Sequence, residues 1–409
     1  MPRPLVATSE EIGEDVDLVA ELPPRRGALW VRGAEGLVGR GEALRLDVGT
    51  GTGRFARAAA QLDDVFAGAV AHGPTGGPGS GPVAFVSATF DPRSPGSVLV
   101  VPAVVTLRRG GRVWRTSVAE VDTVDGDAPA DAGVDRRIRY AGSSIPDVRW
   151  LEAVATATAR IHAGRLDKVV LARDQAVWSR APFDARRLAG RLARAYPDCY
   201  AFVVDGLVGA TPELLVRRTG ASVESLVLAG TARRGTDGAD DAAVGERLLS
   251  SGKERSEHAF AVASVADVLT PRCVELAVDA QPFLLRLANV QHLATRVRGT
   301  LAGPPWPTAF ALAGALHPTA AVCGTPTAAA LDVIRELEGM DRGRYAGPVG
   351  WVDARGDGEF GIALRCAQLA GARARLFAGA GLVAGSLPEE ELEETRLKLR
   401  AMQSAFEGE

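Results

Sequence analysis

The stretch "GPVGWVDARGDGEFGIALRCAQL" (347–369) reads as two short strands joined by a tight turn. Apolar and β-prone residues flank "ARGDG", and Asp and Gly are residues that a tight turn favours. Another strand, "RARLFAGAGLV" (373–383), follows after a short gap. Strands that are joined by short turns pair in antiparallel fashion. This part of the chain therefore predicts an antiparallel sheet.

Helices and strands mix in the rest of the second half without a regular alternation. Other predicted strands are "DKVVLARDQAVW" (167–178) and "YAFVVDGLVGA" (200–210). The predicted helices are one that starts at a cap on Ser144 or Asp147 and ends at Gly164, two long ones at 240–268 and 326–338, and a C-terminal one from Pro388. The first of them places Trp150, Val154, Ala157 and Ile161 on one face. We therefore expect an α+β fold with large antiparallel sheets rather than a doubly wound parallel sheet.

The N-terminal part, about 1–140, reads as strands joined by turns. A Gly/Pro-rich loop at 72–82 has no capacity to pack, and an acidic connector at 122–135 is the best candidate for a boundary. The catalytic core is then about 141–409. We expect the two parts to interleave as one domain over 1–409.

Composition excludes several classes of protein. Hydrophobic residues make up 46% of the 409 residues and charged residues 24%, which is typical of a soluble globular chain. The 47 basic and 50 acidic residues nearly cancel, so neither a nucleic-acid surface nor a membrane surface is indicated. The four cysteines are isolated, without a CxxC motif, and are expected to be free thiols. The N-terminus has no apolar signal-peptide core, and the most apolar run (97–107) is too short to span a bilayer, so a cytoplasmic protein is expected.

Two pairs of carboxylates share one spacing. Glu391 and Glu394 lie three residues apart near the start of the C-terminal helix, and Glu254 and Glu257 do the same in "SSGKERSEHAF". Residues with this spacing lie on one face of a helix. Each pair alone can be a solvated helix start that complements the helix dipole. Together, two such helices can supply four carboxylates to a divalent cation, and oxygen-only ligands suit Mg²⁺.

The glycine-rich strand before Glu391 and Glu394 also indicates a bound cation. Gly379 and Gly381 allow a backbone to approach an anion closely. Carboxylates nearby would repel an anion. A Mg²⁺ ion between the carboxylates and the anion would remove this repulsion. The run lacks the G-x-G-x-x-G spacing of a dinucleotide site.

Four single residues are candidates for the chemistry. Lys168 enters an apolar strand; it can extend to the surface, or act as a general base in a dry pocket. Glu213 follows a proline at the start of a strand, where it can cap a turn or act as a buried general acid. His292 is either a satisfied core histidine or a site residue. Arg365 lies in a strand that is apolar on both sides, so its guanidinium needs a carboxylate, from the protein or from a substrate.

A set of ordered motifs resembles the chorismate-utilising enzyme family, strongly over about 140–408 and more weakly over 88–102. The motifs are "LDKVVLAR", "GATPELLVRR", "LAGTARRG", "SGKERSEHAF", "QHLATRVRG", "LHPTAAVCGTP", "RYAGPVGWVDARGDGEFGIALRCAQL" and "LFAGAGLV" with "EEELEET". The resemblance implies two large, mainly antiparallel sheets flanked by helices. It also implies chorismate as the substrate, Mg²⁺ as the cofactor and a monomer.

The resemblance further implies a role for each motif residue. Lys168 resembles the base that activates water for attack at C2 of chorismate, and Glu213 the acid that protonates the departing C4 hydroxyl. Glu257 and Glu394 resemble the metal ligands, supported by Glu254 and Glu391. The implied substrate-binding residues are Gly230, Thr231, His292, Thr295, Tyr345, Arg365, Gly379, Ala380, Gly381 and Lys398.

Within the family, Lys168 together with Ala229 favours water over ammonia as the nucleophile, and "HPT" resembles the isochorismate-forming branch. Thr231 stands where some members have serine, which leaves a salicylate-forming enzyme open. A homologue that binds chorismate or metal without turnover is the remaining alternative. The pathway that uses the product is not readable from the sequence.

Overall fold

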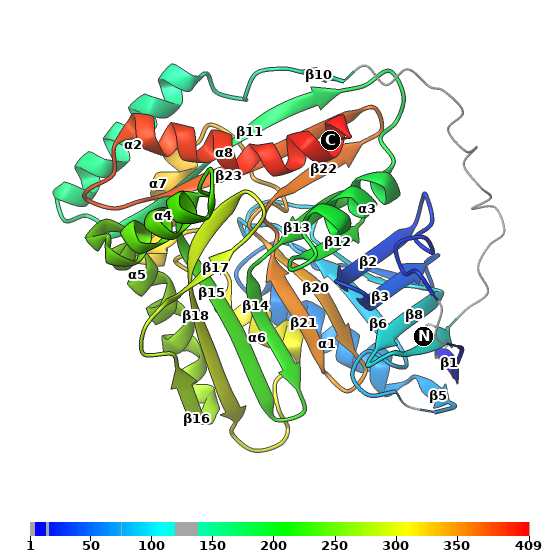
Figure 1. The fold of residues 1–409 in the computed structure, drawn as a ribbon. Helices are drawn as coiled ribbons and strands as arrows, with labels where there is room; N and C mark the ends of the chain where they lie inside the picture. Colours follow the sequence, from blue (N-terminus) through cyan, green and yellow to red (C-terminus); the bar gives the residue numbers. More distant parts are fainter. Residues whose placement is uncertain (1–4, 14–15, 75, 119–137, 409) are drawn as a thin grey trace.

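The computed structural model describes residues 5–13, 16–74, 76–118 and 138–408. Within these residues the chain forms two large sheets with helices around them (Figure 1). The predicted connector at 122–135 lies outside the described residues.

The larger sheet contains 13 strands among the described residues. In spatial order they are β10 (Arg139–Tyr140), β11 (Lys168–Trp178), β23 (Arg373–Leu382), β22 (Cys366–Ala370), β13 (Leu207–Thr211), β12 (Tyr200–Val204), β2 (Gly27–Arg32), β3 (Glu35–Arg40), β8 (Val104–Arg109), β9 (Arg112–Ser117), β1 (Val6–Glu11) and β5 (Val70–His72), with β19 (Gly324–Thr325) beside β11. Of the described strand pairs in this sheet, β1 with β5 is parallel and the others are antiparallel.

The smaller sheet contains ten strands in the same part of the chain. Their order is β16 (Cys273–Val278), β18 (Val290–Leu301), β15 (Ser222–Arg233), β14 (Leu214–Thr219), β21 (Gly358–Ile362), β20 (Pro348–Asp353), β6 (Val83–Ser87), β7 (Val98–Val101) and β4 (Leu44–Asp47), with β17 (Phe283–Arg286) beside β18. Each sheet thus combines strands from before residue 141 with strands from after it, through the pairs β2–β12 and β6–β20.

The helices cover the sheets from several sides. They are α1 (Arg54–Ala67), α2 (Asp147–His162), α3 (Ala185–Ala195), α4 (Gly238–Ser250), α5 (Gly252–Leu269), α6 (Ala309–Leu316), α7 (Thr327–Leu337) and α8 (Pro388–Glu407), with a 3₁₀ turn at Thr270–Arg272. Helix α8 packs on β23 and α5 packs on β15, so these two helices approach the site from different sheets (Figure 1). No helix of the described residues is long and apolar enough to cross a membrane.

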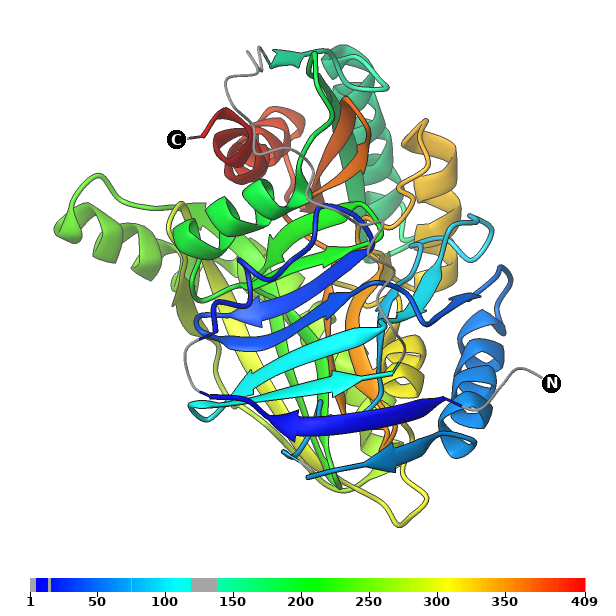
Figure 2. The same ribbon diagram turned by 90° about the vertical axis from the view of Figure 1, so that its right-hand side faces the viewer.

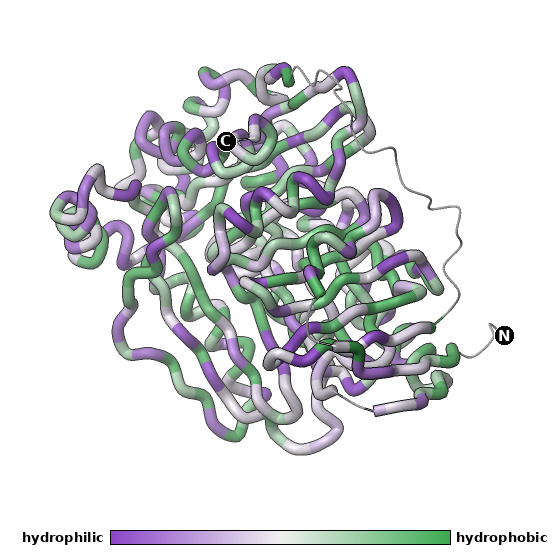
Figure 3. Tube along the Cα trace, turned by 45° about the vertical axis from the view of Figure 1, so that its right-hand side comes forward, coloured by the Kyte–Doolittle hydropathy of each residue, from purple (hydrophilic) through white to green (hydrophobic). Residues whose placement is uncertain are grey.

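Strand alternation explains why the central strands of the larger sheet are buried on both faces. In Figure 2 the N-terminal strands of this sheet, in blue and cyan, lie side by side toward the viewer. In β2, Trp30 packs in the core that includes strands of the smaller sheet, whereas Leu29 packs in a second core with residues of α3 and α8. Successive side chains of a strand point to opposite faces, so one strand serves both cores. Along the trace, hydrophobic segments in green are interrupted by hydrophilic ones in purple (Figure 3).

The α+β fold predicted from the sequence is confirmed. The predicted hairpin at 347–369 is β20 paired with β21, and Asp353 closes its turn by accepting from the backbone N–H groups of Arg355 and Asp357. Trp150, Val154, Ala157 and Ile161 are buried on one face of α2, as predicted.

Five local predictions are wrong. The loop at 72–82 does pack in its described part: Gly79 and Ser80 are buried, and the backbone N–H of Gly79 donates to Asp353 at 2.9 Å. The helix predicted at 240–268 is two helices, because Ser251 adopts an extended conformation and caps α5 with its side chain. Helix α1 interrupts an N-terminal part that reads as strands; its sequence is strongly amphipathic. Neither Ser144 nor Asp147 caps α2: Pro146 is at the cap position, and Ser144 bonds to Asp174. The remaining wrong prediction, the strand assignment of Arg365, is described with the candidate active site.

Candidate active site

A cavity of about 60 Å³ lies where β11 and β23 of the larger sheet meet β15 and β18 of the smaller one. Helix α5 contributes Glu257 to its wall and α8 contributes Lys398. The other lining residues are Val170, Pro212, Glu213, Leu228, Ala229, Gly230, Thr231, His292, Ala321, Val322, Tyr345, Leu364, Arg365, Gly379 and Gly381. Most of the residues predicted for the site therefore meet around one cavity.

Lys168 is the first residue of β11 and is completely buried, so it does not extend to the surface. Its Nζ lies 3.2 Å from Oε1 of Glu257 and 3.4 Å from the Glu257 carbonyl oxygen. A buried ammonium needs a partner of opposite charge, and Glu257 supplies it. Because Glu257 lines the cavity, Lys168 stands directly behind that wall.

Glu213 immediately precedes β14 and faces the cavity. Burial raises the pKa of its carboxyl to about 8, although the backbone N–H of Leu228 and the charges of Lys168 and Arg365 oppose the rise. The carboxyl is then mostly protonated at neutral pH. A buried, protonated carboxyl beside a cavity is suited to donate a proton.

Arg365 does not lie in a strand, contrary to the prediction. It occupies the bend between β21 and β22 with a φ of 45°, and this bend turns its side chain into the cavity. The guanidinium is buried, and the described residues place no carboxylate within ion-pair distance of it. Burial lowers the pKa of Arg365. Its charge remains to be matched by something that enters the cavity.

His292 links Arg365 to β15. Its Nε2 lies 3.3 Å from a guanidinium nitrogen of Arg365, and its Nδ1 lies 3.1 Å from Oγ1 of Thr231 and 3.3 Å from the carbonyl oxygen of Gly230. A guanidinium only donates, so Nε2 accepts and the ring proton is on Nδ1. Burial and the Arg365 charge lower the His292 pKa well below its usual value, which agrees with a neutral ring.

Gly230 shapes this side of the cavity through a β-bulge. The register between β15 and β18 shifts at Gly230, which adopts a φ of 77°. The bulge turns the backbone N–H of Thr231 toward Oε2 of Glu254, 3.2 Å away. Thr295, predicted to bind substrate, does not line the cavity: its hydroxyl bonds to Nε2 of His258, at 2.7 Å.

The glycines of β23 make room for two side chains. A Cβ atom at Gly379 would lie 3.1 Å from the Tyr345 hydroxyl, and one at Gly381 would lie 1.9 Å from Oε1 of Glu257. Ala380, between them, points away into the core, so the structure does not place its side chain at the cavity. Lys398 donates to the carbonyl oxygen of Gly379 at 2.9 Å and pairs with Glu394.

The four predicted metal-binding glutamates come from the first two turns of α5 and α8. Burial raises the pKa of Glu254 to about 7, and the charges of Glu257, Glu394 and Glu391 add to the rise. The pKa of Glu391 is raised by burial and by Glu394. These shifts indicate carboxylates close enough to repel one another.

Each of the four carboxylates has a lysine within ion-pair distance, and Lys253 serves both Glu254, at 3.8 Å, and Glu391. Lys168 contacts Glu257, Lys398 contacts Glu394, and Nζ of Lys253 lies 2.7 Å from Oε1 of Glu391. In the described part of the chain, no group of three His, Cys, Asp or Glu residues is arranged to hold a metal ion. Oxygen-only donors of this kind would suit Mg²⁺.

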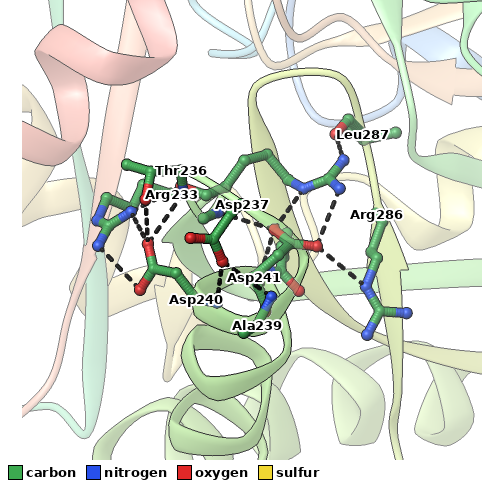
Figure 4. Close-up of polar contacts among 11 residues, drawn as sticks. Arg233, Thr236, Asp237, Ala239, Asp240, Asp241, Arg286 and Leu287 are labelled. Atoms are coloured by element: carbon green, nitrogen blue, oxygen red, sulfur yellow. Dashed lines mark hydrogen bonds and ion pairs between the residues drawn. The ribbon is translucent and has the colours of Figure 1, made fainter.

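A polar network braces the segment that leaves β15 (Figure 4). Asp241 of α4 accepts from Nε and a terminal nitrogen of Arg234 at 2.7 and 2.9 Å, and from the backbone N–H of Gly235 at 2.8 Å. It also accepts from the Gln291 amide at 3.0 Å. Gln291 precedes His292 in β18, so the network ties α4 to the strand that carries the cavity histidine.

Lys253 is the site residue that the sequence analysis missed. The chain contains only three lysines among its 47 basic residues, and these are Lys168, Lys253 and Lys398. All three contact carboxylates of the predicted metal set. Scarcity of lysine in an arginine-rich sequence is therefore a signal that would have found Lys253.

Comparisons with known proteins find similar sequences and a similar structure. A sequence model of the family described as "Chorismate binding enzyme" matches residues 27–407. A Mycobacterium tuberculosis protein provisionally named isochorismate synthase MenF is 40% identical over 343 residues, which cover 80% of this chain and 87% of that protein. The isochorismate synthase DhbC of Bacillus subtilis is 43% identical over 268 residues, covering 63% of this chain and 67% of DhbC.

A solved structure extends the similarity to nearly the whole chain. It is MenF, the menaquinone-specific isochorismate synthase from Escherichia coli, with a TM-score of 0.81 and 25% sequence identity. The match covers 99% of this chain and 95% of that one.

Proposed function

We propose that this chain, which belongs to the chorismate-binding enzyme family, is an isochorismate synthase that converts chorismate to isochorismate. The relatives named above carry that activity in their names, and the cavity has the groups that the reaction requires. The reaction adds water at C2 of chorismate and removes the hydroxyl from C4, so one water enters and one leaves.

The observation that carries the proposal is the buried guanidinium of Arg365. It faces the cavity with His292 as its hydrogen-bond partner and, within the described residues, without a carboxylate partner. A substrate carboxylate matches its planar pair of donors. Chorismate carries two carboxylates, and the Lys398 ammonium at the same cavity can attract the second.

Of the proposed acid and base, Glu213 lines the cavity and Lys168 lies behind its Glu257 wall. In its neutral form Lys168 takes the proton from the attacking water, and Glu213, mostly protonated at neutral pH, gives its proton to the departing C4 hydroxyl. General acid–base catalysis of this kind is worth about 10²–10⁴-fold for each residue. The apolar wall of Val170, Leu228 and Leu364 excludes bulk water from these groups.

We propose Mg²⁺ as the cofactor. Glu257 and Glu394 would hold it, with Glu254 and Glu391 beside them, because the donor set is oxygen-only and neighbouring carboxylates add to the rise that burial gives the pKa of Glu254. When bound, the ion supplies Lewis-acid charge withdrawal from an anionic substrate.

Product analysis tests the proposal. The purified protein is incubated with chorismate and Mg²⁺, and the products are separated by HPLC. We expect isochorismate in equilibrium with chorismate. Salicylate with stoichiometric pyruvate would assign a salicylate synthase instead, and no product would leave only a binding role.

A variant of Arg365 tests the observation that carries the proposal. Arg365→Met is expected to raise KM for chorismate by about 10-fold or more, because a charge-assisted contact is lost. Arg373→Met is the matched control, since Arg373 is exposed at the start of β23. An unchanged KM in Arg365→Met would contradict the assignment.

A further inference from the structure

Lys253 lies among carboxylates at the start of α5. Its Nζ is 2.7 Å from Oε1 of Glu391 and 3.8 Å from Oε1 of Glu254. Glu391 comes from the first turn of α8, so this one ammonium joins the two helices that carry the predicted metal ligands. Its charge therefore lies among carboxylates that are proposed to hold a divalent cation.

Of the three lysines at the site, Lys253 has the most freedom to leave. Its side chain is 24% exposed, compared with 13% for Lys398 and 0% for Lys168. Lys398 is also held by the carbonyl oxygen of Gly379. A flexible side chain with an open path to solvent can withdraw from its partners at little cost.

The choice of lysine over arginine carries information in this chain. Positions that only need a positive charge are filled by arginine, which provides 44 of the 47 basic residues. Arginine binds carboxylates through a rigid, two-pronged fork, whereas the ammonium of lysine is a compact point charge on a flexible stem. A partner that must release its carboxylates is better made from lysine.

We propose that Lys253 is a tethered counter-cation that occupies the carboxylate cluster in the metal-free protein and withdraws toward solvent when a divalent cation binds. This inference rests on the metal site of the proposed function. Lys253 thereby sets the metal affinity: it keeps Glu254 and Glu391 together without metal, and each ion that binds must displace it.

Calorimetric titration with Mg²⁺ tests the competition. Lys253→Met removes the competing charge, so we expect its Kd for Mg²⁺ to be about 10-fold or more lower than that of the wild type. Lys253→Arg keeps the charge and grips the carboxylates more firmly, so its Kd should be equal to or higher than that of the wild type. A Kd that is unchanged or higher in Lys253→Met overturns the proposal.

Arg255→Met is the matched control. It removes a cation from the same turn of α5, but Arg255 is exposed and bonds to Gln281. Its Kd should equal that of the wild type. A decrease equal to that of Lys253→Met would show a general effect of charge and would overturn the specific role of Lys253.

Chemical labelling of the wild type tests the withdrawal without any variant. Acetic anhydride acetylates exposed amines, and mass spectrometry reads each of the three lysines separately. Labelling of Lys253 should rise severalfold when Mg²⁺ is added, while the buried Lys168 remains the unreactive reference. Equal labelling with and without Mg²⁺ overturns the proposal, and this result decides alone if Lys253→Met does not fold.

These readouts separate the inference from the proposed function. Isochorismate formation with an unchanged Kd in Lys253→Met would retain the function and reject the counter-cation. Tighter Mg²⁺ binding in Lys253→Met without any isochorismate would retain the counter-cation and reject the proposed function. Absence of Mg²⁺ binding by wild type and variant alike would reject the metal site and the counter-cation together.

Discussion

Nζ of Lys168 lies 3.2 Å from Oε1 of Glu257, and both residues are buried, with Glu257 at the wall of the cavity and Lys168 behind it. The pair connects the proposed base to a proposed metal ligand. Whatever changes the charge of one residue therefore acts on the other, because the attraction between charges is strong where water is excluded.

Replacement of Lys168 by glutamine removes the proposed base and keeps a hydrogen-bond donor for Glu257. We expect isochorismate formation to fall by about 10²–10⁴-fold. HPLC product assays measure this loss, with far-UV circular dichroism as the check on folding. Arg165→Gln, which removes an exposed cation shortly before β11, should keep full activity. Near-normal turnover in Lys168→Gln would show that another group is the base.

The protonation state of Glu213 should determine how activity depends on pH. Its pKa of about 8 means that the carboxyl is protonated below pH 8 and loses its proton as the pH rises through that value. A general acid works only while protonated, so kcat/KM should decline above about pH 8. Glu213→Gln should be crippled at every pH and lack this decline. A wild-type profile that stays level through about pH 8 to about pH 10 would rule out Glu213 as the acid.

The features that were predicted from the sequence depend on local patterns. The hairpin of β20 and β21 has its turn residues next to each other, and the buried face of α2 repeats with helical spacing. Lys168, Glu213 and the four glutamates stand in recognisable motifs, and the structure brings them around one region. Their catalytic roles stay predictions.

The features that were missed depend on contacts between distant segments. Arg365 is flanked by apolar residues and reads as strand, but its chain bends there with a positive φ. The pairing of Lys253 with Glu391 joins residues 138 positions apart, which no local spacing reveals. Thr295 fits a motif, yet its hydroxyl is used by His258, a neighbour from another element.

Asp241 should stabilise the folded protein by an amount that depends on pH. Hydrogen bonds from Arg234 and from the backbone of Gly235 lower its pKa to about 2. For a carboxyl with a depressed pKa, the stabilisation is present above the unfolded value, 3.8, and is lost as the pH falls through about 2. Asp241→Asn should therefore melt at a lower temperature than the wild type at neutral pH.

The difference in melting temperature should close between about pH 4 and about pH 2, as Asp241 itself becomes neutral. Differential scanning calorimetry over this range gives both curves. Asp267→Asn, an exposed carboxyl on α5, is the control and should match the wild type throughout. A difference that persists undiminished at about pH 2 would show that the charge of Asp241 is not its source.

Alanine substitutions at Gly381 and at Gly385 should have very different effects. A Cβ atom at Gly381 would lie 1.9 Å from Oε1 and 2.6 Å from Cδ of Glu257. The same carboxylate is paired with Lys168. At Gly385, the nearest atom to a new Cβ would be Cγ of Lys253 at 3.9 Å, an ordinary contact. Gly381→Ala must therefore displace the Glu257 carboxylate, and Gly385→Ala displaces nothing.

Misplacement of a catalytic group by about 1 Å can cost about 10²-fold in rate. We expect a loss of at least that size in Gly381→Ala, together with weaker Mg²⁺ binding, and near-wild-type values in Gly385→Ala. Product assays and calorimetric Mg²⁺ titration give the two readouts. If Gly381→Ala folds, turns over normally and binds Mg²⁺ as the wild type does, then the position of Glu257 against β23 is not required for the chemistry.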